Sequence, residues 1–152
     1  MPGDPSLTRI AAAMQRLGRR ANLPRLHEHF AARAGVAIDR GAYGVLLRVA
    51  DEGPHRVTAL ARALGVEPST VTRQVQVLEA AGCVSRSPDP DDRRAHRVAV
   101  TDQGLDALAR LGEARCEVLA EVLAGWGEAD RLVLAASLER FADDLVDYAG
   151  RL

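Results

Sequence analysis

Apolar residues recur every three or four positions along most of this 152-residue chain, and this spacing predicts α-helices. The first apolar stripe begins after Ser6, a residue type that often caps helices. Pro24 interrupts the stripe, so the helix either kinks there or restarts with Asn22 as a new cap. The stripe ends at Gly35, and a short buried helix is expected over residues 41–50.

Shorter elements are expected in the middle of the chain. Thr58 can cap a helix that ends at Gly65, where a left-handed residue is needed. Pro68 occupies the first position of another helix, where its missing N–H costs nothing, and this helix runs to about Ala81. Two short helices that cross around a glycine turn are typical of a helix-turn-helix unit.

Two extended runs follow the second of these helices, Val84–Ser87 and His96–Val100, on either side of a turn-rich segment. They predict a β-hairpin, because the segment between them is too rich in turn residues for a helix. A hairpin in this position makes the unit a winged helix-turn-helix. This order of elements places one helix in a DNA major groove with a loop beside it.

After Thr101 the pattern is helical to the end of the chain. Two further apolar stripes are expected, formed by Leu105, Leu108, Gly112, Cys116, Leu119 and Leu123, and by Leu134, Leu138, Phe141, Leu145 and Tyr148. Apolar residues lie on more than one side of these helices, which is more than one compact lobe can cover. A partner subunit is the simplest way to bury them.

The helix from Pro68 to Ala81 has one apolar and one polar face. Val71, Val75 and Leu78 fall within a narrow sector at 100° per residue and form the expected core face. The opposite face carries hydrogen-bonding side chains, namely Ser69, Thr72, Arg73 and Gln76. Ser69 and Thr70 also lie in the first turn, where free N–H groups and the helix dipole favour a phosphate. An ordinary surface helix has such a face too, but the neighbouring elements favour the DNA-binding interpretation.

Charged residues surround the predicted hairpin. Four arginines lie in or beside it: Arg86, Arg93, Arg94 and Arg97. Three aspartates lie at its turn: Asp89, Asp91 and Asp92. The arginines could reach the DNA backbone or the minor groove, or they could simply pair with the aspartates. We expect both, with Asp92 holding Arg94 in place while the tip of the hairpin stays basic.

The net charge of −1 does not by itself indicate nucleic-acid binding, but its distribution is uneven. Residues 1–50 carry eight arginines against three acids, and residues 102–152 carry five arginines against eleven acids. The acidic C-terminal third is therefore not expected to contact phosphate. All twenty basic residues are arginine, which a GC-rich genome explains better than selection for guanine recognition.

The sequence also bears on the compartment. It contains no apolar run of about 18 residues, so no membrane span is expected. The first residues lack a cationic start followed by an apolar stretch, so no secretory signal is expected. Cys83 and Cys116 lie far apart and fit a reducing compartment, where we expect both to be buried and inert. A cytoplasmic location follows from these observations.

Catalytic, cofactor and metal sites are not expected. His27 and His29 are two residues apart on a helix, so they point to different sides and cannot hold one metal ion together. No cluster of cysteine and histidine has the spacing of metal ligands. The chain has no glycine-rich phosphate loop, nucleophile elbow or pair of catalytic carboxylates, so an enzyme is not predicted.

Two segments carry a resemblance to a known family. PSTVTRQVQVLEAAGCVSR resembles the recognition helix of MarR-family transcriptional regulators, with its Leu-Glu-x-x-Gly turn and a following strand arginine, here Arg86. DPDDRRAHRVAVT is similar to the wing of that family, with Asp92 and Arg94 at its Asp-x-Arg positions and Val100 where leucine is usual. Two departures are Gln74, where the family often has an apolar residue, and Val77, where a charged residue is common.

The resemblance implies a mainly α fold with a small β-hairpin wing. Residues 1–152 would form a single MarR-like chain, with a winged helix-turn-helix lobe at 40–101 and a helical dimerisation region at 6–35 and 102–150. It further implies a homodimer on pseudo-palindromic double-stranded DNA, and repression that a small-molecule effector or an oxidant relieves. A ligand pocket between the first, second and fifth helices of the family fold would hold such an effector.

The DNA-contacting residues expected from the pattern and the resemblance are Ser69, Thr70, Thr72, Arg73, Gln76, Arg86, Arg93 and Arg94, with Asp92 stabilising the wing. The alternative is a winged helix that binds a protein, as an adaptor or anti-repressor. The weak net charge supports this alternative, whereas the arginines on the expected DNA face argue against it. Salt-dependent binding to duplex DNA would distinguish the two, because phosphate contacts release counterions.

Overall fold

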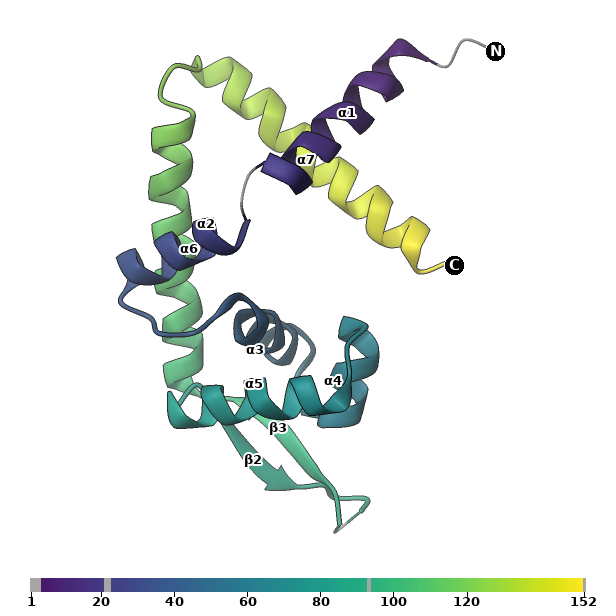
Figure 1. The fold of residues 1–152 in the computed structure, drawn as a ribbon, viewed down its shortest axis with the longest axis vertical. Helices are drawn as coiled ribbons and strands as arrows, with labels where there is room; N and C mark the ends of the chain where they lie inside the picture. The colour runs from purple at the N-terminus through teal and green to yellow at the C-terminus, as the bar shows by residue number, and fades with distance from the viewer. Residues whose placement is uncertain (1–3, 21–22, 93, 152) are drawn as a thin grey trace. The chain divides into compact units, whose positions relative to one another are not determined.

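The computed structural model describes residues 4–20, 23–92 and 94–151. Within these ranges the chain has seven helices and a three-stranded antiparallel sheet (Figure 1). The elements in chain order are α1 (Pro5–Arg20), α2 (Leu23–Ala34), α3 (Arg40–Glu52), β1 (His55–Arg56), α4 (Val57–Leu64), α5 (Pro68–Ala80), β2 (Val84–Pro88), β3 (His96–Val100), α6 (Asp102–Val122) and α7 (Glu128–Ala149). The predicted mainly helical fold with a β wing is confirmed. The chain divides into two compact units between Arg115 and Cys116.

The N-terminal stripe forms two helices. Pro24 is the second residue of α2, so a new helix starts there, and the proposed cap Asn22 lies outside the described residues. Asp4, rather than the predicted Ser6, caps α1, because its Oδ1 accepts the Ser6 backbone N–H at 2.8 Å. α2 ends at Ala34, immediately before Gly35, as predicted.

The third helix forms the centre of the core. Asp39 caps it by accepting the Ala42 N–H at 2.8 Å. Its buried face consists of Ala42, Val45, Leu46 and Val49, all 0% exposed. The predicted helix over residues 41–50 is therefore correct and extends slightly further at both ends.

The helix-turn-helix lies against this helix. α4 begins at Val57 with Arg56 as its cap, so the predicted cap Thr58 lies inside the first turn instead. Gly65 ends α4 in the left-handed region, with φ of 65°, and Pro68 begins α5, both as predicted. The three residues predicted to face the core from α5 are all 0% exposed: Val71, Val75 and Leu78.

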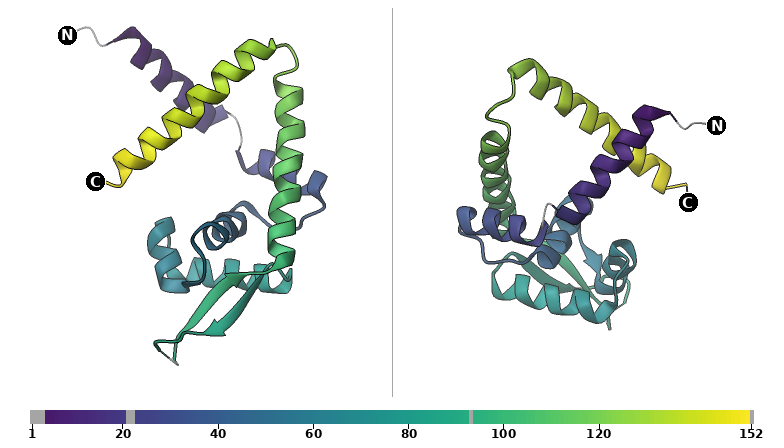
Figure 2. Two further views of the ribbon diagram at one scale, coloured as in Figure 1. Left: turned by 180° about the vertical axis from the view of Figure 1, so that it is seen from behind. Right: turned by 45° about the horizontal axis from the view of Figure 1, so that its top comes forward.

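The wing is a sheet in the order β1-β3-β2. The predicted strand at His96–Val100 is confirmed, and the preceding strand extends one residue further than predicted, to Pro88. β1 was not predicted, because a two-residue strand has no periodicity of its own. It pairs with the middle strand, with Arg56 opposite Arg97. The hairpin of β2 and β3 projects beyond α5 (Figures 1 and 2).

Within the chain, the sixth helix buries residues beside the predicted apolar stripe, and of that stripe Leu108 packs partly against the core. Ala107, Leu111 and Ala114 are at most 2% exposed, whereas Leu105 of the predicted stripe is 49% exposed. Cys116 is also exposed, which corrects the prediction that both cysteines are buried. Cys83 is buried, and burial raises the pKa of its thiol, so the thiol stays protonated at neutral pH.

Two helices keep their large apolar side chains exposed. α7 has no buried residue, and its exposed apolar side chains are Leu132, Val133, Leu138, Phe141, Leu145, Val146 and Tyr148. The large apolar side chains of α1 are exposed as well, namely Leu7, Ile10, Met14 and Leu17. No helix in the described part of the chain is both long and apolar enough to cross a bilayer.

Candidate nucleic-acid interface

The outer face of α5 is polar and exposed. Ser69, Thr70, Arg73 and Gln76 are all exposed, on the side of the helix away from Val71 and the rest of its core face. Glu67 stands at the cap position but makes no side-chain hydrogen bond to the first turn. Pro68 has no N–H, and the Thr70 N–H donates to the Glu67 carbonyl at 3.0 Å. Of the first three residues of α5, Ser69 therefore keeps a backbone N–H that can meet an anion.

Thr72 lies at the flank of this face. Its side chain is half-buried, and its hydroxyl donates a hydrogen bond to the Pro68 carbonyl at 2.9 Å. The donated proton is used within the helix, whereas the hydroxyl oxygen can still accept a hydrogen bond. The role of Thr72 as a DNA contact stays a prediction, in which its hydroxyl oxygen could only accept a hydrogen bond from the DNA.

The tip of the wing is held by backbone contacts. Asp92 Oδ1 accepts the backbone N–H of Arg94 at 3.0 Å, so Asp92 contacts this residue through its main chain and not through its guanidinium. The Asp92 carbonyl also accepts the Ala95 N–H at 2.9 Å. The Arg94 side chain is exposed, and Arg93 lies outside the described residues. The turn thus presents Arg94 to solvent.

The base of the wing is locked by one buried carboxylate. Asp89 is 2% exposed, and its Oδ2 accepts hydrogen bonds from Arg56 Nε and Arg97 Nε, each at 2.7 Å. These two guanidinium groups hold the pKa of Asp89 far below its usual range, so the carboxylate is ionised at neutral pH. Arg97 also contacts Asp91 at 3.2 Å. Pairing with the aspartates, one of the two possibilities in the sequence, therefore holds for Arg97.

Asp89, Arg56 and Arg97 form an ion-pair cluster, called the lock below. The lock joins the wing to the start of the helix-turn-helix, because Arg56 belongs to β1 and stands at the N-cap position of α4. Neither Arg56 nor the particular role of Asp89 among the three aspartates was predicted from the sequence. The two residues are 33 positions apart, so no local pattern connects them. An arginine directly before a short helix was the only signal available.

Arg86 connects the wing to α5. Its Nε lies 2.9 Å from Glu79 Oε2, and both side chains are about one-third exposed. The guanidinium thus links the first wing strand to α5. Its predicted contact with DNA stays a prediction, and any such contact would share the guanidinium with Glu79.

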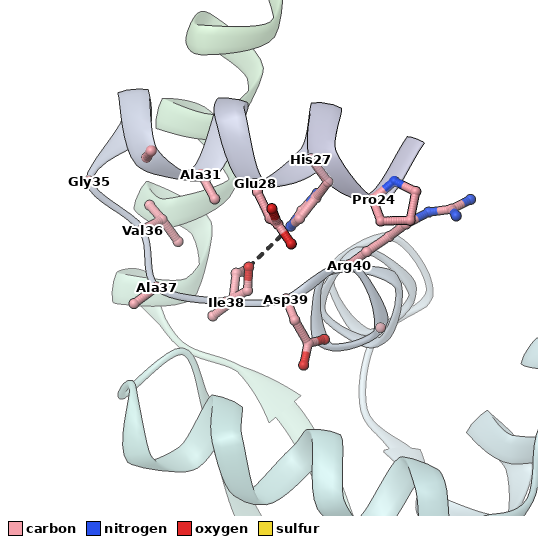
Figure 3. A pocket seen from close by; sticks show the side chains of 12 residues that line it. Pro24, His27, Glu28, Ala31, Gly35, Val36, Ala37, Ile38, Asp39 and Arg40 are labelled. Carbon is pink, nitrogen blue, oxygen red and sulfur yellow. Dashed lines mark hydrogen bonds between the residues drawn. The ribbon is translucent and has the colours of Figure 1, made fainter. Parts of the chain in front are cut away.

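Two cavities lie beside α2, within the same compact unit. The larger, of about 640 Å³, is lined by α2 and its connection to α3 (Figure 3). Figure 3 shows His27 reaching from α2 toward this connection, where its Nε2 lies 3.0 Å from the Ile38 carbonyl oxygen. Arg40 stands at one end of the cavity, and Glu28 lies along its wall.

The smaller cavity, of about 160 Å³, combines cationic and aromatic groups. It is lined by Leu26, His27, Phe30, Arg40, Tyr43 and Arg115. The Arg115 guanidinium carbon lies 5.7 Å from the ring centre of Phe30 and 5.2 Å from that of Tyr43, within cation–π range. Arg115 also donates a hydrogen bond to the Tyr43 hydroxyl at 2.5 Å. Among the described residues, no group of three or more His, Cys, Asp or Glu is placed to hold a metal ion.

Comparison with known proteins places this geometry in a family. The model of the MarR family matches residues 38–96. The HTH-type transcriptional regulator YxaD of Bacillus subtilis is 32% identical over 111 residues, which are 72% of this chain and 77% of that protein. The HTH-type transcriptional regulator PecS of Dickeya dadantii is 32% identical over 88 residues, covering 58% of this chain and 53% of PecS.

Solved structures agree with this comparison. RV1404 from Mycobacterium tuberculosis superposes with a TM-score of 0.73 at 28% identity, over 93% of this chain and 95% of RV1404. The crystal structure of MarR gives a TM-score of 0.69 over 97% of this chain and 99% of MarR. At 20% identity, this second likeness concerns the fold alone.

Proposed function

Since this chain belongs to the MarR family of HTH-type transcriptional regulators, we propose that it is a ligand-responsive repressor that binds pseudo-palindromic operators as a homodimer. The observation that carries the proposal is the exposed polar face of α5, which lies beside a wing with an exposed arginine at its tip. Residues 40–101 would form the DNA-binding lobe. Residues 6–35 and 102–150 would form the dimerisation region.

The recognition helix supplies the specific contacts in this proposal. Arg73 and Gln76 lie on its outer face and have the length and donors to reach base edges in the major groove. Ser69 and Thr70 lie in the first turn, where their hydroxyl groups and the Ser69 backbone N–H suit a phosphate. Arg94, with Arg93 beside it, would act at the adjacent backbone or minor groove.

The exposed apolar side chains support the homodimer. α1 and α7 each show a helical series of large apolar residues to solvent. Monomeric proteins rarely expose contiguous apolar surface of this kind, because covering it lowers the free energy. A second copy of the chain offers a matching surface, and two-fold symmetry would match the two halves of a palindromic operator.

The two cavities beside α2 support the effector. Both include His27 and Arg40, and the smaller adds the rings of Phe30 and Tyr43. Arg40 and Arg115 bring two positive charges to an apolar, aromatic wall. An anion with a flat apolar body fits these groups best, because the guanidinium groups bind the charge and the rings stack on the body.

The experiment is selection of bound DNA from a random duplex pool at two salt concentrations. We expect a palindrome with half-sites about one helical turn apart, and binding that weakens as salt increases. Binding without salt dependence, or no enrichment at either salt, would contradict the repressor and favour a winged helix that binds protein. Sedimentation equilibrium in the same buffer tests the homodimer, and a monomer at micromolar concentration would contradict it.

A further inference from the structure

The end of α5 and the start of α6 meet at one backbone segment (Figures 1 and 2). Gly82 turns the chain out of α5 in the left-handed region, with φ of 70°. The Cys83 N–H then donates to the Leu78 carbonyl of α5 at 2.8 Å, and the Cys83 carbonyl accepts the N–H of Thr101, the residue before α6, at 3.0 Å. The backbone of Cys83 is therefore bonded to the ends of both helices. Residues 81–83 and 101–104 are called the joint below.

Side chains at the start of α6 close the joint. The Thr101 hydroxyl donates to the Gly82 carbonyl at 2.6 Å and accepts the Gly104 N–H at 3.1 Å, so Thr101 caps α6. The Gln103 side-chain amide donates to the Ala81 carbonyl at 2.9 Å. Carbonyl groups at a helix end lack partners within the helix. Here the first turn of α6 supplies partners for the chain end of α5.

Gly104 brings the backbone of α6 into direct contact with the joint. It is buried, and a Cβ atom there would overlap the Cys83 carbonyl oxygen and lie 2.9 Å from Val100 Cγ2. The obstacle is a main-chain carbonyl, held by hydrogen bonds on both sides of Cys83, and it cannot turn aside as the end of a long side chain can. Any side chain at position 104 would therefore displace α6 from α5.

A displacement at the joint grows along α6. This helix is continuous from Asp102 to Val122. From Gly104 to its end it extends about 27 Å, at about 1.5 Å per residue, so a tilt of about 5° at the joint moves the far end by about 2 Å. The proposed dimerisation region begins with this helix. The position of α5 relative to its copy in the partner would therefore depend on the angle at the joint.

We propose that Gly104 and Thr101 are positioning residues, which fix the angle between α5 and α6 and thereby set the half-site spacing that the homodimer selects. This inference rests on the proposed repressor function. Neither residue is expected to touch DNA, so their effect is on whether both lobes can engage their half-sites at once. Simultaneous engagement raises the affinity without a new contact and is lost where the geometry forbids it.

Five variants test the joint. Gly104→Ala displaces it, Thr101→Val removes the hydroxyl without adding bulk, and Thr101→Ser keeps the hydroxyl as the conservative replacement. Gly44→Ala is the control for an added methyl group, because its Cβ lies in α3 and would meet no heavy atom within 4 Å. Val49→Ala, at a buried position of α3, is the control for a general loss of stability. All are compared at a temperature where every variant is folded.

Fluorescence anisotropy measures the affinity for the selected palindrome and for a duplex in which one half-site is scrambled. Gly104→Ala should bind the palindrome about tenfold more weakly than the wild type and the single half-site within about twofold, because each lobe still makes its own contacts. Gly44→Ala and Val49→Ala should show no such split. Equal losses of Gly104→Ala on both duplexes, or wild-type affinity for both, would overturn the proposal.

Selection from the random duplex pool, repeated with the variants, reads the spacing itself. Gly104→Ala should enrich a palindrome whose half-sites are further apart or closer together than those of the wild type. Thr101→Val should enrich several spacings, because the joint is loosened rather than displaced, and Thr101→Ser should restore the wild-type spacing. A single, unchanged spacing in both Gly104→Ala and Thr101→Val would overturn the proposal.

Hydrogen exchange without DNA gives a readout that does not depend on the operator. In Gly104→Ala, the amides of Cys83 and Thr101 should exchange faster, because the displaced helix weakens the hydrogen bonds of the joint, and Gly44→Ala should leave them unchanged. Wild-type exchange rates in Gly104→Ala would overturn a rigid joint. If the wild type itself enriched no palindrome, the repressor proposal would fail, and exchange would still decide whether the joint is rigid.

Discussion

The winged lobe and the last helix use apolar residues in opposite ways. In α3 and α5, residues spaced three or four apart are completely buried, among them Leu46 and Leu78. In α7, residues with similar spacing, such as Leu138 and Leu145, are about half exposed, and no residue of that helix is buried. The sequence pattern is alike in both regions. The difference is whether the same chain provides the surface that covers it.

This difference has an energetic meaning. A fully buried leucine contributes about 1.5–3 kcal/mol relative to an exposed one, so the lobe has a core that can stabilise it alone. A helix with no buried side chain gains little beyond its backbone hydrogen bonds and is marginal in water. α7 should therefore depend on association with a partner, and the lobe should not.

Matched leucine truncations test this difference most directly. Leu78→Ala should reduce the free energy of unfolding by about 2–5 kcal/mol at any protein concentration, because it leaves a cavity in the core. Leu138→Ala, which starts from 55% exposure, should have an effect that grows with concentration, because only the associated form covers it. Urea unfolding at two protein concentrations measures both. Equal, concentration-independent losses would erase the distinction between the two regions.

The buried carboxylate of the wing gives the next largest effect. Asp89→Asn should lower the Tm by about 5 °C or more at neutral pH, because Arg56 and Arg97 lose their shared anion. The pKa of Asp89 is depressed in the folded state, so its stabilisation is present above the unfolded value of about 4 and is lost below it. The Tm difference from wild type should thus be constant from pH 5 to 8 and shrink on further acidification.

The matched control for this variant is Asp143→Asn on the exposed surface of α7, which should change the Tm little at any pH. Melting followed by circular dichroism across the pH series compares the two. A Tm difference between wild type and Asp89→Asn that widened toward low pH would contradict a stabilising role of the ionised Asp89 carboxylate.

Arginine truncation separates the two regions by DNA affinity. Arg73→Ala on the outer face of α5 should cost about 1–3 kcal/mol of operator binding, equivalent to about five- to 150-fold. Arg140→Ala on α7, whose side chain is 87% exposed, is the control and should bind DNA as the wild type does. Fluorescence anisotropy with the selected duplex measures both. An Arg73→Ala variant of full affinity at moderate salt would refute the recognition-helix assignment.

Glycine substitutions should give the smallest effects, with opposite signs. Gly65→Ala should destabilise the lobe by about 1 kcal/mol, because alanine is strained at a φ of 65°. Gly112→Ala in the middle of α6 should stabilise by up to about 1 kcal/mol, since its Cβ would meet no heavy atom within 4 Å. Thermal melts of the two variants check the signs. Two changes of the same sign would contradict the turn geometry.

Local signals predicted most of the lobe. Pro68 fixed the start of α5, and the turn-rich segment between Val84 and Val100 placed the hairpin, because helix starts and turns depend on neighbouring residues. The Asp89–Arg56 lock was missed because it joins residues brought together only by the fold.

Which face of α6 the chain itself buries could not be predicted from the sequence, for a different reason. Periodicity gives a helix and its spacing, but the neighbouring elements decide which of several apolar faces is buried. The structure buries Leu111 between the small residues Ala107 and Ala114, and it leaves Leu105 and Leu119 about half exposed. The two alanines let α6 approach closely around Leu111, whereas Leu105 and Leu119 remain available to another surface.

The single tryptophan has a practical consequence for following this protein by its intrinsic fluorescence. Trp126 lies after α6, in the second compact unit, and is 47% exposed. Its emission will therefore respond to events around α6 and α7, while the winged lobe contains no tryptophan and is spectroscopically silent at that wavelength. A blue shift of the emission maximum upon concentrating the protein would report the covering of this region, with no dye or label attached.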